Sequence, residues 1–275
     1  MDWSEAWAEV KELPTRMRTI RVVGWQEAKR ADPREVVASL AAGDLWILKR
    51  VFPQTAMRIL REDVIEWVRS RPTSFHKMLE GSPDFHRIID LETGTKYAFR
   101  CCKHSAYFYR WNGDPIGAYS LVTGPWRAAK RMMGLDPFSY EANTPRDGVV
   151  DRVQVVRYPP SIGFLEPHHD PHEHQRLFFS VYMSRRGVDY DGGGFYALDQ
   201  KDRPVEIEDA IEVGDACIGA ATIVHGVSPC DRGKKADWNA TDGRWFLSTY
   251  SNASDEGQSR HTGRPARVEV AGVMP

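Results

Sequence analysis

One stretch of the sequence combines strand-forming residues, turn signals and metal-ligand side chains: VQVVRYPPSIGFLEPHHD, residues 153–170. Valine and aromatic residues in its first six positions favour a β-strand. The prolines and the glycine that follow are turn signals. Its last three residues place two histidines beside an aspartate. The stretch therefore predicts a strand, a turn and a second segment whose end carries metal-ligand side chains.

Short runs rich in strand-forming residues recur along the second half of the chain. They are LFFSVYM (177–183), GGFYAL (193–198), ACIGAATIV (216–224) and RWFLSTYS (244–251). Short strands separated at this spacing by turn signals are typical of an antiparallel β-sandwich or barrel. We therefore expect a mainly β protein with some α-helix, built on a jelly roll with N-terminal helices packed against the barrel.

The first half of the chain has a different pattern. WILKRVF (46–52) indicates a strand, and apolar residues at helical spacing indicate an amphipathic helix within 55–70. Residues 71–90 are expected to form a structured loop, residues 106–111 a strand and residues 124–136 a helix.

No linker or internal repeat divides the sequence. We expect one domain over residues 1–275, in which 1–150 form a mixed α/β extension that packs on the core and 151–251 form the jelly-roll core. Residues 252–275 are polar and are expected to form a tail.

Bulk composition excludes several classes of function. The chain has 37 Lys and Arg against 38 Asp and Glu, a formal net charge of −1, so no basic surface for nucleic acid or an anionic membrane is expected. Neither a signal peptide nor a transmembrane stretch is apparent. Four cysteines without a CxxC pair are expected to be free thiols. These features predict a cytoplasmic protein without a nucleic-acid or membrane partner; oligomeric state is left open.

The aspartate and one histidine in the opening stretch suit a shared metal ion. On a strand, residues i and i+2 project to the same side, so His168 and Asp170 can bind one ion while His169 faces away. A third ligand is expected from a distant strand, where IVHGVSPC supplies His225. Two imidazoles and one carboxylate on one face of an octahedron leave positions open for O2 and a bidentate ligand, as iron(II) oxygenases require.

A second register competes for the metal. His172 and His174 also share a strand face and resemble an HxH metal motif, but Pro171 interrupts the strand between the two pairs. We therefore interpret His169, His172 and His174 as surface loop residues.

Several motifs in register resemble the iron(II)/2-oxoglutarate-dependent oxygenases of the small-molecule hydroxylase type. They follow one another over roughly residues 157–251 and comprise HxD at 168–170, Gly-Gly at 192–194, Gly214-Asp215, His225, and Val227 to Pro229. The resemblance implies a double-stranded β-helix, an Fe(II) centre with His168, Asp170 and His225 as catalytic ligands, 2-oxoglutarate as co-substrate, and O2.

The resemblance also implies a basic residue for the far carboxylate of 2-oxoglutarate on the strand after the distal histidine. Arg244 opens that strand and Ser248 follows on the same face, where a guanidinium and a hydroxyl can bind a carboxylate together. Arg244 lies 19 positions after His225, farther than is usual in the family, because the polar residues 231–243 form an inserted loop. Arg232, Lys234 and Lys235 in that loop are the alternative. Further candidates for co-substrate binding are Arg176, Gln154, Tyr182, Arg157 and Tyr158.

The reaction that the resemblance implies is oxidation of an unactivated C–H bond, as hydroxylation, desaturation or ring closure. Aromatic and cationic residues in the first half suggest a small polar metabolite with a carboxylate, such as an amino acid derivative. These wall residues are Phe75, His76, Phe85, His86, Arg87, Tyr109, Arg110 and Trp111. Two other functions stay open, namely a zinc hydrolase with the same three ligands and a non-catalytic jelly-roll binding protein.

Overall fold

The computed structural model describes residues 2–256, 263–266, 268 and 270. The helices are α1 (Trp3–Ala8), α2 (Trp25–Ala28), α3 (Pro33–Ala41), α4 (Gln54–Arg69), α5 (Leu91–Gly94) and α6 (Ala118–Met132), with 3-10 turns at Arg110–Asn112, Pro145–Asp147 and Glu208–Ala210. The strands are β1 (Ile20–Gly24), β2 (Leu45–Lys49), β3 (Phe85–Ile89), β4 (Cys101–Tyr109), β5 (Val149–Tyr158), β6 (Phe164–His169), β7 (Leu177–Tyr182), β8 (Gly194–Leu198), β9 (Pro204–Glu206), β10 (Ala216–Ala220), β11 (His225–Ser228), β12 (Arg244–Ala253) and β13 (Arg264–Pro265).

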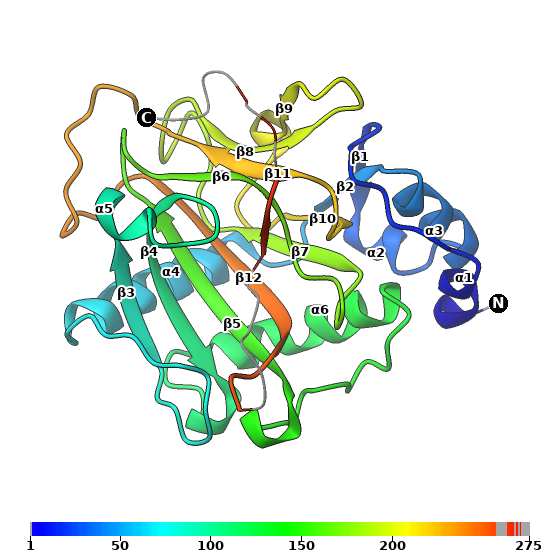
Figure 1. Ribbon diagram of the computed structural model, residues 1–275, viewed down its shortest axis with the longest axis horizontal. Coiled ribbons are helices and arrows are strands. Elements are labelled where there is room, and N and C mark those ends of the chain that lie inside the picture. The colour runs from blue at the N-terminus through cyan, green and yellow to red at the C-terminus, as the bar shows by residue number, and fades with distance from the viewer. Residues whose placement is uncertain (1, 257–262, 267, 269, 271–275) are drawn as a thin grey trace.

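The strands form a strongly curled sheet with two facing halves (Figure 1). The larger half has the order β1-β2-β10-β7-β12-β5-β4, with β3 added on β4, and the smaller half has the order β6-β11-β8-β9. The first residues of β4 pair with β6 and join the halves. From β5 to β12 successive strands alternate between the two halves, except that β9 pairs with β8 within the smaller half, and this arrangement confirms the predicted jelly roll.

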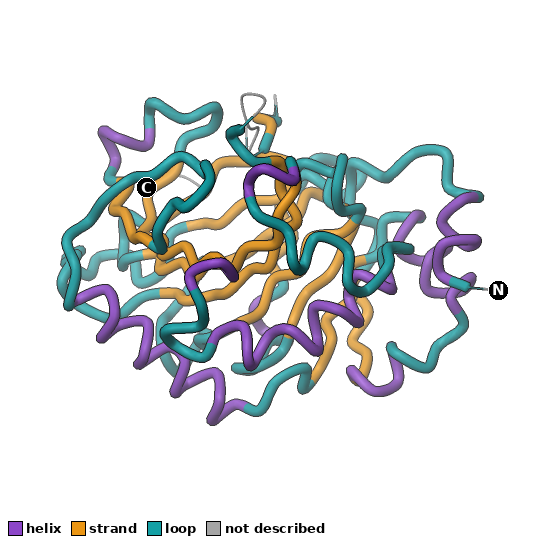
Figure 2. Tube along the Cα trace, turned by 90° about the horizontal axis from the view of Figure 1, so that it is seen from below, coloured by secondary structure: helices purple, strands orange, loops and turns teal. Residues whose placement is uncertain are grey.

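Two long helices cover the outer face of the larger half, as the predicted architecture requires (Figure 2). Met57, Leu60 and Val64 of α4 and Trp126 of α6 are buried in one core cluster with side chains of the sheet. The apolar face of each helix is therefore used for packing, and the inner face of the sheet remains free to line a site.

Strand β12 pairs antiparallel with β5 along its whole length, from Arg244 opposite Tyr158 to Ala253 opposite Val149. Because side chains alternate between the faces of a sheet, every second residue of both strands points into the barrel. This register places Ser248 beside Gln154. Ten residue pairs between β5 and β12 fix the position of both side chains, independently of the length of the loop before β12.

The first half of the chain differs from the sequence-based prediction in two places. Residues 85–89, expected to be loop, form β3 because the strand-forming β4 offers them a partner. Helix α6 begins at Ala118 rather than at residue 124, so Pro125 lies inside it. The carboxylate of Asp114 accepts the backbone N–H groups of Tyr119 and Ser120 and so caps the earlier start.

The tail expected at 252–275 lies partly outside the described residues. In the described part, β13 pairs with β6, and Ala266, Val268 and Val270 pack against a buried cluster around Tyr196. No helix among the described residues has both the length and the apolar character that crossing a bilayer requires.

Candidate metal centre and its pocket

His168, Asp170 and His225 come together where β6 ends and β11 begins. His168 is paired with His225 across the two antiparallel strands. Asp170 follows β6, and its backbone N–H donates to the carbonyl of Ala221 at 2.9 Å, which fixes the turn that carries its side chain. The three side chains offer one ligand atom each, and these atoms lie within 4.8 Å of one another. The residues predicted to share a metal are therefore adjacent in space.

The hydrogen bonds of the two imidazoles leave the same nitrogen free on each ring. Nδ1 of His168 lies 2.9 Å from the carbonyl of Glu166, and Nδ1 of His225 lies 2.8 Å from the carbonyl of Ile223. A carbonyl oxygen can only accept a hydrogen bond, so each Nδ1 carries the donated hydrogen and each Nε2 has a lone pair for a metal. The Nε2 atoms lie 3.6 and 3.8 Å from the two carboxylate oxygens of Asp170, longer than a hydrogen bond.

The pKa values of His225 and Asp170 are both shifted in the direction that metal binding needs. All three side chains are buried. Burial lowers the pKa of His225 to about 4, with a further contribution from His168. Burial raises the pKa of the Asp170 carboxyl, but the imidazoles of His168 and His225 outweigh it, so this pKa lies below its ordinary value. At neutral pH the site therefore offers a neutral His225 and a carboxylate.

The neighbouring histidines do not join this cluster. His169 lies on β6 opposite Arg264, and His174 makes an edge contact with the ring of Tyr140. Among the described residues, His168, Asp170 and His225 form the group whose ligand atoms converge, and neither His172 nor His174 belongs to it.

Arg244 lies at the start of β12, as expected, with its side chain fully buried inside the barrel. Its Nε donates to Oε1 of Glu208 at 2.8 Å, while its Nη1 is buried without a hydrogen-bond partner among the described residues. Burial lowers and the Glu208 carboxylate raises the pKa of Arg244, which on balance lies above its ordinary value. The guanidinium is therefore charged and held on one side only.

Two tyrosine rings near this guanidinium carry hydroxyls that also lack hydrogen-bond partners in the described part of the chain. The Arg244 guanidinium carbon lies 5.7 Å from the ring centre of Tyr158 and 5.3 Å from that of Tyr182, and both hydroxyls are buried without a hydrogen bond to any described residue. Burial raises the pKa of both tyrosines well above the ordinary value, so both remain donors. The Ser248 side chain, further along the same face of β12, is also buried. Buried donors without acceptors around an arginine fit a carboxylate ligand.

The structure distributes the other co-substrate candidates differently. Gln154 faces the same interior, where its side chain lies 3.3 Å from Oγ of Ser105. Arg176 points away, since its Nη1 donates to the carbonyl of Met133 at 2.8 Å and its guanidinium lies over the ring of Trp7. Its expected role at the site therefore has no support in this arrangement.

The loop before β12 is anchored from outside the barrel. Arg157, another candidate, donates to the carbonyls of Asp237, Trp238 and Asp242. Lys234 pairs with Asp231 at 2.6 Å. These charges stabilise the inserted loop, and they do not converge on the metal centre.

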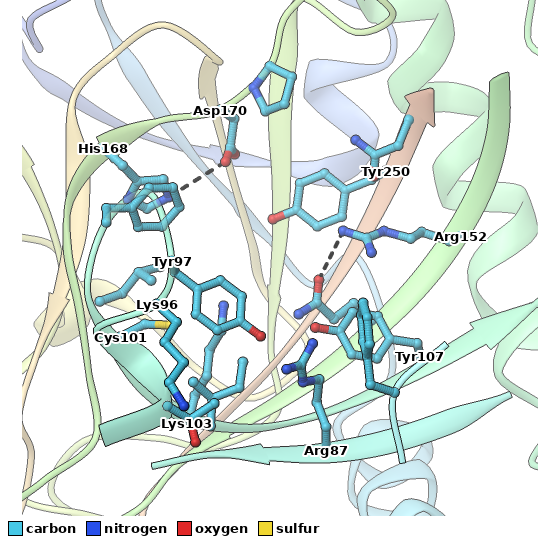
Figure 3. Close-up of a pocket in the computed structure, with 18 of the residues that line it drawn as sticks. Arg87, Lys96, Tyr97, Cys101, Lys103, Tyr107, Arg152, His168, Asp170 and Tyr250 are labelled. Carbon is cyan, nitrogen blue, oxygen red and sulfur yellow. Dashed lines mark hydrogen bonds and ion pairs between the residues drawn. The ribbon is translucent and has the colours of Figure 1, made fainter. Parts of the chain in front are cut away.

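A cavity of about 400 Å³ opens beside His168 and Asp170 (Figure 3). This volume suits a small-molecule ligand. The lining residues come from β3, β4, β5, β6, β12, the segment around α5 and the loops before β3 and after β6: Phe75, Phe85, Arg87, Ile89, Thr93, Lys96, Tyr97, Phe99, Cys101, Lys103, Tyr107, Arg152, Gln154, Leu165, His168, Asp170, Pro171, Phe246, Tyr250 and Asn252.

Three of the eight expected wall residues, Phe75, Phe85 and Arg87, line this cavity. The other five do not line it. Nδ1 of His86 lies 2.9 Å from Nε2 of His104, and the ring of Tyr109 stacks on that of Trp111. Sequence reasoning missed Arg152, Lys103 and Tyr250. Strand alternation gave a signal for two of them, because Arg152 is two residues from Gln154 and Tyr250 is two residues from Ser248.

No protein-family model matches the sequence. The search of curated proteins finds no match either. Solved structures with a similar fold include JOX2 in complex with 2OG, Fe and JA, with a TM-score of 0.50 and 12% identity over 96% of this chain and 85% of that chain. A full-length Neurospora crassa protein in complex with alpha-KG and thymine has a TM-score of 0.50 and 11% identity over 87% of each chain. The chain therefore shares the double-stranded β-helix fold of these 2-oxoglutarate complexes.

Proposed function

We propose that the protein is an iron(II)- and 2-oxoglutarate-dependent dioxygenase that oxidises a C–H bond of a small polar molecule. One observation carries the proposal: the ligand atoms of His168, Asp170 and His225 lie within 4.8 Å of one another, and His168 and Asp170 line a ligand-sized cavity. Two imidazoles and a carboxylate on one side of an ion leave the other side open.

The chain's own residues fit iron and 2-oxoglutarate in separate ways. Nε2 of His168, Nε2 of His225 and a carboxylate oxygen of Asp170 would hold the metal. Arg244 would bind the far carboxylate of 2-oxoglutarate through its unpaired Nη1, with the hydroxyls of Tyr158 and Tyr182 as further donors. Glu208 is a positioning residue, since it accepts the hydrogen bond of Nε of Arg244 and leaves Nη1 available to a ligand.

Bound iron(II) with O2 and 2-oxoglutarate supplies the oxidising power, and 2-oxoglutarate leaves as succinate and CO2. The protein positions the reactants and keeps water out. Phe99 stacks on the ring of His168 at 4.3 Å between centres, and Phe195 and Phe178 flank His225. These rings fix both imidazoles and surround the site with apolar surface.

The proposed substrate is a small metabolite, and the expected reaction is hydroxylation. A hydrolase with zinc at the same ligands is less well supported. Among the described residues that line the cavity, Asp170 is the sole carboxylate. Once Asp170 binds the metal, this lining offers no second carboxylate to act as a general base for hydrolysis.

The deciding experiment is anaerobic addition of iron(II) and 2-oxoglutarate, followed by visible spectroscopy and, after O2 is admitted, succinate measurement. We expect a metal-to-ligand charge-transfer band in the parent protein and in His169→Ala, whose side chain is outside the cluster, but not in Asp170→Ala. Tight zinc binding with no such band would point to the hydrolase. Equal bands in the parent and Asp170→Ala would remove Asp170 from the metal centre.

A further inference from the structure

Arg152 is a buried cation without a counter-ion among the described residues. Its side chain lies on β5 and is 6% exposed, yet its Nε has no hydrogen-bond partner there. Its Nη2 lies 3.3 Å from the neutral side-chain oxygen of Gln154. A guanidinium removed from water without a carboxylate costs stability, so this position is unfavourable unless an anion binds there.

Aromatic rings on both sides hold the Arg152 guanidinium in place. Its central carbon lies 5.3 Å from the ring centre of Tyr107 and 5.4 Å from that of Tyr250. All three residues line the cavity beside the metal centre. Figure 3 shows Arg152 reaching into the cavity between these rings, on the side away from His168. Its geometry is therefore set before any ligand arrives.

Three more cations line the same cavity. Arg87 on β3 lies over the rings of Phe75 and Tyr97. Lys103 on β4 and Lys96 after α5 complete the set. Against these four cations stands a single cavity-lining carboxylate among the described residues, Asp170, which belongs to the metal centre. The field in the cavity therefore favours an anion.

We propose that the substrate is a small organic anion, a carboxylate or a phosphate ester, without a free ammonium group. Its charged group binds Arg152, with Arg87 nearby, and its carbon skeleton extends past Tyr250 toward the metal ligands. A zwitterionic amino acid would place its ammonium group among cations, and the one carboxylate of the described lining, Asp170, belongs to the metal centre. This inference rests on the proposed function and names the substrate class for that site.

The substrate anion and 2-oxoglutarate would use different arginines. Arg244 lies inside the barrel at the start of β12 and does not line the cavity. Arg152 lies opposite Tyr250, six residues further along β12. The two guanidinium groups can therefore be tested independently.

The test is calorimetric titration of the purified protein with saturating 2-oxoglutarate, using four probes built on a phenyl group: 3-phenylpropanoate, phenyl phosphate, 3-phenylpropanamide and phenylalanine. We expect at least one anion to bind at least tenfold more tightly than the amide and phenylalanine, and the tighter of the two identifies the anion class. Equal binding of all four, or no binding by either anion at millimolar concentration, would overturn the inference.

Arg152→Gln should lower the affinity for the bound anion at least tenfold and leave 2-oxoglutarate affinity unchanged. Arg30→Gln, an exposed arginine outside the cavity, is the matched control and should behave like the parent. A loss of 2-oxoglutarate affinity in Arg152→Gln would instead make Arg152 part of the co-substrate site. Arg152→Met should raise the unfolding midpoint of the ligand-free protein, because it removes an uncompensated buried charge. A lowered midpoint would show that Arg152 is structural.

The two proposals can fail separately. A charge-transfer band with iron(II) and 2-oxoglutarate, but no preference for anions, would support the oxygenase proposal and contradict the proposed substrate class. Anion binding that depends on Arg152, but no band, would support the anion site and contradict the oxygenase proposal.

Discussion

Nε of Arg244 lies 2.8 Å from Oε1 of Glu208, and both side chains are fully buried. Glu208 also accepts the hydroxyl of Tyr190 at 2.7 Å and the backbone N–H of Phe195 at 2.6 Å. The carboxylate is thus satisfied by three donors, whereas the arginine keeps Nη1 unpaired among the described residues. A pair that was purely structural would not leave a buried donor of the cation unused.

Removal of this pair should separate its structural role from its binding role. Arg244→Met alone leaves a buried carboxylate without its cation and should cost about 3–5 kcal/mol in free energy of unfolding. Adding Glu208→Gln removes that charge and should restore most of the loss in urea unfolding. The double variant should still bind 2-oxoglutarate roughly 100-fold more weakly, because the loss of a buried charged contact costs about 2–5 kcal/mol. Unchanged 2-oxoglutarate affinity would transfer the role to another cation.

The unpaired tyrosine hydroxyls make a second prediction. Tyr158→Phe and Tyr182→Phe should each weaken 2-oxoglutarate binding about tenfold, since a hydrogen bond to a charged group contributes about 1.5–3 kcal/mol. Neither variant should destabilise the ligand-free protein, because neither hydroxyl has a partner among the described residues. Tyr196→Phe is the control, as its hydroxyl is also buried and unpaired there but lies on β8 away from Arg244. An equal effect in all three variants would contradict the assignment.

Gly194 should be intolerant of a side chain. A Cβ added there would lie 2.4 Å from Cγ of Glu208, and the residue has a φ of +115°. Gly194→Ala should therefore cost about 3 kcal/mol and displace Glu208 from Arg244. Gly192→Ala, where φ is +60° and a Cβ meets no atom within 4 Å, should cost about 1 kcal/mol. Chemical denaturation compares the two, and similar losses would show that backbone strain alone matters.

The stability of the metal-free protein should fall as the pH is lowered through the range of histidine titration. Burial lowers the pKa of His104 to about 4 from 6.5. Between these values the unfolded chain binds a proton that the folded protein does not, so stability is present above pH 6.5 and is lost toward pH 4. The share of His104 is about 1.4 kcal/mol per pH unit. In urea unfolding, the free energy of unfolding of His104→Gln should depend less steeply on pH than that of the parent. An unchanged pH dependence would show that His104 does not contribute to it.

The strands in the second half of the chain could be predicted from the sequence because the strand patterns there are short, regular and bounded by turns. The convergence of His168, Asp170 and His225 could also be predicted, since the alternation expected of a strand puts the first two on one side and the motif order supplies the third. In the structure Asp170 lies just past the end of β6. Arg244 and Ser248 lie on one face of β12 for the same reason.

Other features depended on tertiary partners that no local pattern reveals. Residues 85–89 become a strand because β4 offers them an edge, and this brings Arg87 to the cavity. Glu208 sits in a 3-10 turn with no motif, yet it contacts Arg244 from 36 residues away. The charge of the cavity is likewise a property of several strands together, so a chain with a net charge of −1 can still enclose a cationic site.

The loop that Arg157 anchors has a consequence for how such chains should be compared. Ten residue pairs with β5 set the register of β12, and Arg157 secures the loop before it through three carbonyls. The loop can therefore lengthen or shorten as a module without moving Arg244 relative to His225. Sequence distance between these two residues is then free to drift during evolution, and strand pairing, not a fixed count of residues, is the reliable guide to which arginine is equivalent.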